Sequence, residues 1–189
     1  ALRQVIPQVL SAAEISVRLG TTWIPQEDIQ QFVMELLTPS SYAAGKIKVR
    51  YTAINGDWFI ENKSSDYGNV KADSTYGTKR ASAYRIIEDT LNLRDVRIFD
   101  YVYDENGNKK AVFNHKETTA AQAKQEVIKQ AFQDWIWKDP ERRNRLVRSY
   151  NDTFNSVRPR EYDGSHITFG GISPEITLRP HQVNAIAHI

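Results

Sequence analysis

Two Asn-Gly dipeptides place the strongest limits on how this chain can fold. Asn55-Gly56 and Asn106-Gly107 each combine residues that tolerate the positive φ angles of a tight hairpin turn. Apolar and polar side chains alternate before the first turn, as they do in a half-buried strand. The four strands are expected at residues 47–52, 58–60, 96–102 and 111–113. The sequence therefore predicts two antiparallel β-hairpins.

Helices are predicted before, between and after the hairpins. Ser11-Ala12-Ala13-Glu14 is a capping-box pattern for a helix that ends at Gly20. The helices are expected at residues 11–20, 25–38, 81–93, 114 or 118 to 137, 139–155 and from 180 onward. This order predicts an α+β fold, with two antiparallel β-hairpins packed with about five helices, an irregular C-terminal linker and a tail helix. Residues 1–156 are expected to form one α+β module, and residues 157–189 the linker and tail.

The composition excludes several classes of function. The 189 residues include no cysteine, which rules out disulfides, thiol catalysis and cysteine-ligated zinc. The four histidines show no metal-ligand spacing, so no metal site is predicted. A net charge of only +2 provides no global field that would drive the chain onto DNA or a membrane. No apolar run approaches the roughly 18 residues of a membrane-spanning helix.

The most basic stretch is WKDPERRNRLVRSYNDTFNSVRPR. On a helical wheel Arg142, Arg145 and Arg148 lie opposite the apolar face, whereas Arg143 projects among the apolar positions. Arginine forks match phosphate oxygens, and Trp137 is available for stacking. The spacing also allows three i,i+4 ion pairs, Asp139–Arg143, Glu141–Arg145 and Arg148–Asp152. A phosphate-binding face and a self-neutralised helix are both consistent with this pattern.

Two shorter motifs carry other candidate chemistry. Lys79 and Arg80 stand before a predicted helix, where backbone N–H groups attract phosphate; the alternative is a glycine turn with two solvated cations. Asp57, Glu61 and Lys63 resemble the acid-x-lysine pattern of Mg²⁺-dependent nucleases. Charges at the ends of a strand are the alternative for this second motif.

The tail resembles part of an ATP-binding motor. In superfamily-two helicases a glutamine shortly before the first motor strand hydrogen-bonds the adenine of ATP. The sequence LRPHQ, residues 178–182, resembles that element. The resemblance makes Gln182 and Arg179 residues of the adenine side of an ATP site that only the parent protein would complete.

Four segments together resemble one family, the large DNA methylase–helicase fusion proteins of phages and bacterial mobile elements. They are LGTTWIP, YGTKRASAYRIIEDTLNLRDV, KQEVIKQAFQDWIWKDPERRNRLVRSYNDTFN and RPREYDGSHITFGGISPEITLRPHQ. The resemblance places this chain between the methyltransferase and the ATPase motor, with residues 157–189 leading into the motor. It implies ATP with Mg²⁺ and S-adenosylmethionine as cofactors of the parent, and the neighbouring methyltransferase and helicase domains as partners. The lack of cysteine, of a signal-peptide pattern and of a spanning apolar run predicts a cytoplasmic protein without a membrane partner.

A non-catalytic DNA-handling and connecting domain is therefore expected, with no cofactor of its own, because the catalytic motifs of both enzymes are missing from these residues. The residues predicted to contact DNA are Lys79, Arg80, Trp137, Arg142, Arg145, Arg148, Arg158 and Arg160. The alternative is a structural interdomain scaffold, in which the arginines pair with Asp139, Glu141 and Asp152. DNA binding predicts instead one continuous positive face that includes Lys79 and Arg80. A cryptic Mg²⁺-dependent nuclease is a third, remote alternative.

Overall fold

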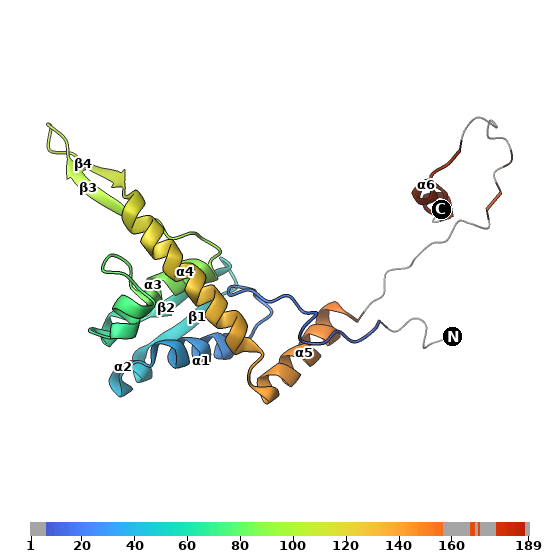
Figure 1. The fold of residues 1–189 in the computed structure, drawn as a ribbon, viewed down its shortest axis with the longest axis horizontal. Coiled ribbons are helices and arrows are strands. Elements are labelled where there is room, and N and C mark those ends of the chain that lie inside the picture. Colours follow the sequence, from blue (N-terminus) through green and yellow to red (C-terminus); the bar gives the residue numbers. More distant parts are fainter. Residues whose placement is uncertain (1–6, 157–166, 169, 171–176, 188–189) are drawn as a thin grey trace. The chain divides into compact units, whose positions relative to one another are not determined.

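A computed structural model describes residues 7–156, 167–168, 170 and 177–187. The chain divides into two compact units. One unit is Leu10–Asn151, and the other combines Ala1–Val9 with Asp152–Ile189. The first unit is an α+β domain with two separate two-stranded antiparallel sheets (Figure 1). The predicted fold class is confirmed.

The elements follow one another as helices, hairpin, helix, hairpin and helices. In chain order they are α1 (Gln26–Leu37), α2 (Ser41–Lys46), β1 (Lys48–Thr52), β2 (Asp57–Glu61), the 3₁₀ helix η2 (Lys63–Asp66), the π-helical turn η3 (Lys71–Thr75), α3 (Ala83–Leu91), β3 (Phe99–Tyr103), β4 (Lys109–Phe113), α4 (His115–Ile136), α5 (Pro140–Phe154) and α6 (Pro180–Ala187). The short helix α2 was not predicted. It begins because the Ser40 side chain accepts a hydrogen bond from the Ala43 N–H group.

The β1–β2 hairpin is built into the core. Val49 lies opposite Ile60 in the register, and both are buried. Helices α1 and α3 pack against this hairpin, and their side chains bond its outer edges. Gln30 of α1 accepts from the Val49 N–H at 2.6 Å, and Glu88 of α3 accepts from the Ile60 N–H at 2.7 Å. Because both edges are bonded in this way, a sheet of only two strands is stable inside the domain.

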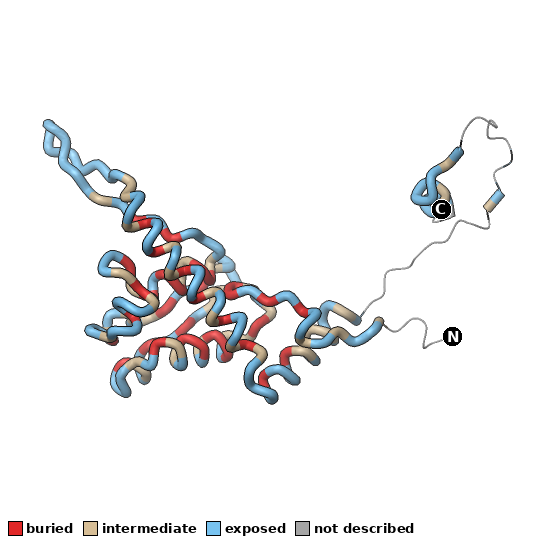
Figure 2. Tube along the Cα trace, in the orientation of Figure 1, coloured by how far each residue is buried: buried red, intermediate tan, exposed pale blue. Residues whose placement is uncertain are grey.

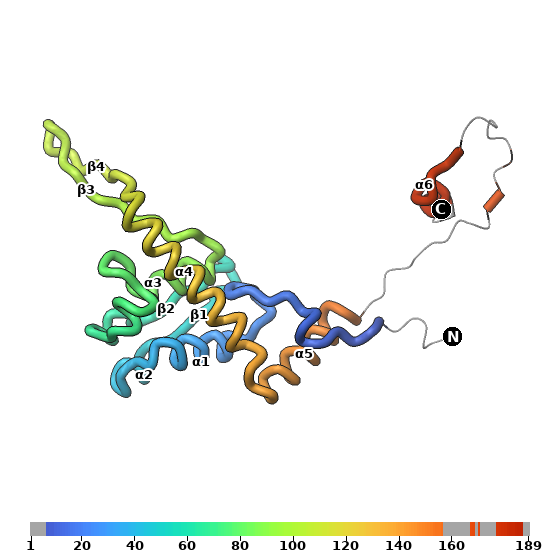
Figure 3. The backbone as a smooth tube through the Cα atoms, viewed as in Figure 1, coloured from blue at the N-terminus to red at the C-terminus, as the bar shows by residue number. Residues whose placement is uncertain are grey.

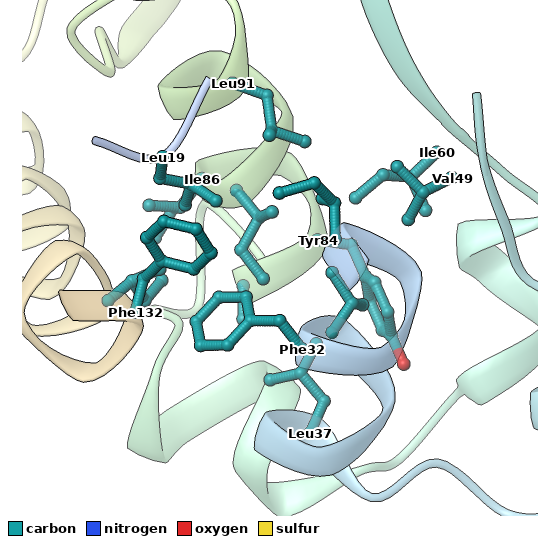
Figure 4. Close-up of a cluster of buried hydrophobic side chains, with 14 of the residues drawn as sticks. Leu19, Phe32, Leu37, Val49, Ile60, Tyr84, Ile86, Leu91 and Phe132 are labelled. Atoms are coloured by element: carbon teal, nitrogen blue, oxygen red, sulfur yellow. The ribbon is translucent and has the colours of Figure 1, made fainter. Parts of the chain in front are cut away.

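A single hydrophobic core joins α1, α3, α4 and the β1–β2 hairpin. Its largest fully buried side chains include Tyr84, Phe32 and Phe132. Figure 4 shows these aromatic rings among aliphatic side chains from the surrounding elements. The Phe32 and Phe132 rings meet edge to face, with centroids 5.0 Å apart, an arrangement that stabilises aromatic pairs.

The predicted helix over residues 11–20 is wrong. Its capping-box contacts do form, since the Ser11 N–H donates to Glu14 Oε2 at 2.8 Å, but they close only a turn. Ile15, Val17 and Leu19 are buried alternately, which is the period of an extended chain rather than of a helix. The free energy gained by burying these alternate side chains against the core outweighs that of the local capping contacts.

The third strand begins three residues later than predicted. Residues 96–98 pass along α4, whose side chains take the backbone bonds that a neighbouring strand would make. Gln125 accepts from the Val96 N–H at 3.3 Å, and Thr118 accepts from the Ile98 N–H at 3.0 Å. Regular pairing therefore starts only at Phe99.

The ends of the first unit are tied together at α5. The Leu10 N–H donates to Asn151 Oδ1 at 2.8 Å, and Asn151 Nδ2 donates back to the Leu10 carbonyl at 2.9 Å. The segment that follows Leu10 then runs away from α5 toward the core, as the blue tube in Figure 3 shows.

Candidate nucleic-acid interface

Arg142 was predicted to contact phosphate, and the structure corrects this. The residue is only 6% exposed. Its Nε donates to the Ile136 carbonyl at 3.1 Å and its Nη2 donates to the Trp135 carbonyl at 2.7 Å. The guanidinium carbon also lies 3.4 Å from the centroid of the Trp135 ring. Arg142 is therefore the C-terminal cap of α4, and its positive charge faces the negative end of that helix.

The helical wheel placed Arg142 and Arg143 the wrong way round. Arg142 precedes the buried Leu146 by four residues and shares its face, whereas Arg143 is exposed. Arg143 reaches the Trp137 carbonyl at 3.5 Å, and its side chain is exposed instead of projecting among the apolar positions.

Arg145 binds a carboxylate from a distant part of the chain. Its Nη1 and Nη2 reach the two oxygens of Asp28 at 3.1 and 2.6 Å. Asp28 is almost fully buried in α1, and its hydrogen bond raises the pKa of the Arg145 guanidinium. Arg145 thus makes a bidentate ion pair with Asp28 of α1 in place of the predicted i,i+4 pair with Glu141. This ion pair anchors α5 to the core.

The other candidates of this segment differ in accessibility. Trp137 follows α4 and packs partly buried against the core, and Arg148 is exposed on α5. Arg158 and Arg160 lie outside the described residues.

Lys79 and Arg80 lie before α3, as predicted, but the Arg80 side chain binds the second hairpin. Its Nη1 lies 2.7 Å from Asp100 Oδ1, and its Nη2 donates to the Phe99 carbonyl at 3.1 Å. Asp100 also accepts from the Asn114 amide at 2.7 Å. The Asn114 hydrogen bond, followed by that of Arg80, lowers the pKa of the Asp100 carboxyl. Ala83 and Tyr84, the first two residues of α3, are buried, which reduces the access of a phosphate to that helix start.

The two predicted cationic groups do not form one continuous face. Arg80 is tied to the base of the β3–β4 hairpin, beside Asn114 at the start of α4. Arg142 caps the other end of α4. Since α4 has 22 residues, these ends are about 33 Å apart, and Figure 1 shows β3–β4 and α5 at its opposite ends.

The β3–β4 hairpin is exposed, although the sequence predicts that both hairpins pack with the helices. No residue of either strand is buried, and the hairpin projects from the rest of the unit (Figure 2). Among the described residues, no carboxylate lies within ion-pair distance of Lys109 or Lys110 on β4. The only sequence signal was the pair of adjacent lysines after Asn106-Gly107.

Side-chain contacts along the ribbon and at its turn stabilise this exposed hairpin. The Phe99 and Phe113 rings meet edge to face at 5.5 Å, and Lys109 Nζ lies 4.1 Å from the centroid of the Tyr101 ring. At the turn, Asp104 accepts backbone bonds from Asn106 and Asn108. An isolated hairpin is marginally stable, so these contacts add to the stability of the projecting arm.

The nuclease residues are not brought together. Asp57 and Glu61 lie at opposite ends of β2, about 13 Å apart along the strand. Lys63 Nζ donates to both oxygens of Glu88 at 2.7 Å instead of approaching either acid. Within the described part of the chain, no three His, Asp or Glu side chains are placed to hold a metal ion.

The tail residue Gln182 makes a local contact in the second unit. Its Oε1 accepts from the Arg179 N–H at 2.9 Å, at the start of α6. Both residues are exposed. In this chain the Gln182 side chain therefore acts as a helix cap.

These features define a small α+β domain with a projecting β-hairpin arm. The chain belongs to the family described as Domain of unknown function (DUF8437), which matches residues 18–156. No curated protein and no solved structure matches the chain. Across the residues that the structure describes, none of the helices has the length and apolar character to cross a membrane.

Proposed function

We propose that this chain is a non-catalytic DNA-handling and connecting domain of a larger DNA methylase–helicase, and that the β3–β4 hairpin is its DNA-contacting element. The observation that carries the proposal is an ordered ribbon that buries none of its strand residues and presents Lys109 and Lys110. A hairpin that contributes so little to the core has its surface available for a partner.

The charges around the hairpin favour a phosphate backbone as that partner. Asp100 is neutralised by Arg80, so the main acid at the base of the hairpin is offset. Exposed Lys79 adds a cation next to Arg80. Ammonium groups on a projecting arm attract phosphates without reading sequence, through counterion release. The two acids at the tip of the hairpin, Asp104 and Glu105, repel phosphates. A bound DNA strand is therefore expected to lie along β4 and the hairpin base.

The test is fluorescence anisotropy of labelled DNA titrated with the full chain at several salt concentrations. Binding should weaken with salt, and the Lys109→Gln/Lys110→Gln variant should lower the slope of log K against log salt by about 1.4 to 1.8, since each lost phosphate contact contributes about 0.7 to 0.9. The matched control is Lys48→Gln/Lys71→Gln, which removes two exposed lysines elsewhere in the unit and should leave the slope unchanged. Equal effects of the two variants would contradict the proposal.

A structural interdomain scaffold is the second candidate, and the arginines of α5 favour it. Arg142 caps α4, and Arg145 binds Asp28, so both serve the cohesion of the domain. In the parent protein, such a body would hold the methyltransferase and the motor at a fixed separation. Absence of DNA binding even at low salt would select this function.

The connecting role extends to the ATP site of the proposed parent. Gln182 and Arg179 would contact adenine there, and Gln182 would exchange its cap on α6 for the base. The present chain alone should neither hydrolyse ATP nor methylate DNA. An ATPase assay with DNA should give the buffer rate, and turnover that purifies with the chain would overturn this part of the proposal.

A further inference from the structure

We infer that one face of the β3–β4 hairpin is a stacking platform for the bases of single-stranded DNA. This face, called the aromatic face, consists of Phe99, Tyr101, Tyr103, Phe113, Ala111 and Lys109. The inference rests on the proposed DNA-handling function and names the form of DNA that the arm takes.

The strand register places these side chains on one side of the ribbon. Side chains at every second position of a strand share a face, so Phe99, Tyr101 and Tyr103 point the same way. Directly opposed residues also share a face, and the register pairs Phe99 with Phe113 and Tyr103 with Lys109. The two faces therefore differ in kind, because Asp100, Val102, Lys110 and Val112 occupy the other face.

The aromatic rings are open to solvent along most of the arm. Phe99 is 39% exposed, Tyr101 59% and Tyr103 72%. An apolar strip of this kind on an arm that contributes no buried strand residue marks a surface for a partner. Aromatic rings can stack on any base, because every base has a π-face. The binding free energy from stacking grows with the number of stacked bases.

The spacing of the rings fits an extended single strand rather than a duplex. Consecutive aromatic positions are two residues apart, which is about 6.8 Å along an antiparallel strand. Bases in duplex DNA rise by about 3.4 Å along each strand. One base per ring therefore requires a strand stretched to about twice its duplex rise, which only unpaired DNA can adopt.

The position of Lys109 provides the phosphate contact beside the stacked base. Its Nζ lies 4.1 Å from the centroid of the Tyr101 ring, a cation–π contact that is weak on an exposed surface. A phosphate beside a base on Tyr101 would draw the ammonium group from the ring at little cost. A purely aliphatic surface would offer Lys109 no such partner.

Tyrosine variants separate stacking from phosphate attraction. The full chain should bind labelled oligo-dT more tightly than a duplex of equal length. Tyr101→Leu/Tyr103→Leu keeps apolar area and removes two π-faces, so it should weaken oligo-dT binding by about thirtyfold or more. It should leave duplex binding and the salt slope unchanged. The control is Tyr42→Leu/Tyr67→Leu, in which Tyr42 has the same lysine contact outside the hairpin; its oligo-dT affinity should not change.

A structural readout keeps the inference testable if a variant folds poorly. In the unaltered chain, oligo-dT should shift the ring resonances of Tyr101 and Tyr103 upfield in NMR spectra, while those of Tyr42 and Tyr67 stay in place. Oligo-dT binding that survives Tyr101→Leu/Tyr103→Leu but depends on Lys109 and Lys110 would overturn the stacking inference and leave the DNA-handling function standing. Absence of binding to any DNA would overturn both. Self-association that is lost in Tyr101→Leu/Tyr103→Leu would assign the aromatic face to a second copy of the chain.

Discussion

Arg142 and Arg143 are adjacent, yet the structure gives them different physical roles. Arg142 is buried and bonds two carbonyls at the end of α4, whereas Arg143 is exposed. A buried arginine is stable only where carbonyls or carboxylates take its donors. The Trp135 ring covers the guanidinium of Arg142, which shields these bonds from water in the native structure.

Arg142→Met should destabilise the domain far more than Arg143→Met. Methionine fills the space but leaves the Ile136 carbonyl without the donor that Arg142 supplies, which costs about 1 to 3 kcal/mol of unfolding free energy. The Trp135 carbonyl keeps the Lys138 N–H as a donor at 3.1 Å. Arg143→Met should change it by no more than about 0.5 kcal/mol. Urea unfolding followed by circular dichroism measures both, and equal losses would contradict the assigned cap.

Two glycines provide a second contrast at the same scale. A Cβ on Gly77 would lie 2.0 Å from the Ala72 carbonyl oxygen and 2.8 Å from the Ala83 nitrogen, both backbone atoms. Gly77→Ala should therefore cost about 1 to 3 kcal/mol of unfolding free energy. Gly45→Ala, in α2 with nothing near its Cβ, should stabilise the domain by up to about 1 kcal/mol. Thermal unfolding should move in opposite directions for the two variants.

Secondary structure elements were predictable where capping and periodicity agree. Helix α4 begins after Asn114, whose side chain accepts from the Glu117 N–H at 3.0 Å, and α5 begins after Asp139, which accepts from the Arg142 N–H at 2.7 Å. At residues 11–20 the two signals disagree, and the alternating burial outweighs the cap. The sequence alone does not say which signal prevails, because the decision depends on the core that the segment meets.

The candidate site was less predictable because its contacts are not local. The partner of Arg145 is 117 residues away in sequence, and helical spacing within α5 carries no information about it. The β3–β4 hairpin was predicted as an element, but an alternating strand of aromatic residues is equally typical of a buried sheet. Two features of the described structure accompany its exposure. Side chains of α4 bond the backbone of residues 96–98, just before β3 begins. No described helix bonds the outer edges of β3 and β4 along their length.

The junction between β3 and α4 has a measurable signature at Asp100. The pKa of its carboxyl is held below 3.8 by the Asn114 and Arg80 hydrogen bonds. Because this pKa is depressed in the folded state, the stabilisation is complete well above pH 3.8 and is lost as the pH falls through the folded-state pKa. Asn114→Ser keeps a good N-cap for α4 but removes the amide donor, so the Asp100 pKa should rise toward 3.8.

Carbon-detected NMR titration of the aspartate carboxyls would measure this shift. The matched control is Asn108→Ser, which removes a side-chain bond to Asp104 and should raise the pKa of Asp104 alone. A shift of both carboxyls in either variant would mean that the hairpin unfolds as a whole, and that the junction is not an independent contact.

At the scale of the whole molecule, the arm proposed to bind DNA and the folded body are different elements. The core joins α1, α3, α4 and the β1–β2 hairpin, and α5 is fastened to it by Arg142 and Arg145. The β3–β4 arm meets this body through Arg80, Asp100 and Asn114. The proposed DNA-handling function would use this division, with the arm contacting DNA while the body keeps its shape.

Shortening the arm tests that division directly. Replacing residues 102–110 with Asn-Gly would leave Tyr101 and Ala111 as the pair that flanks a two-residue turn. The unfolding free energy should change by no more than about 1 kcal/mol, because the excised residues are exposed. Binding to oligo-dT should weaken strongly, because the excision removes Tyr103 from the aromatic face together with both lysines. Urea unfolding and anisotropy on the same preparation measure the two effects. A large loss of stability would make the arm part of the folding unit, whereas intact binding would move the DNA contact to the α5 end of α4, where exposed Arg148 lies.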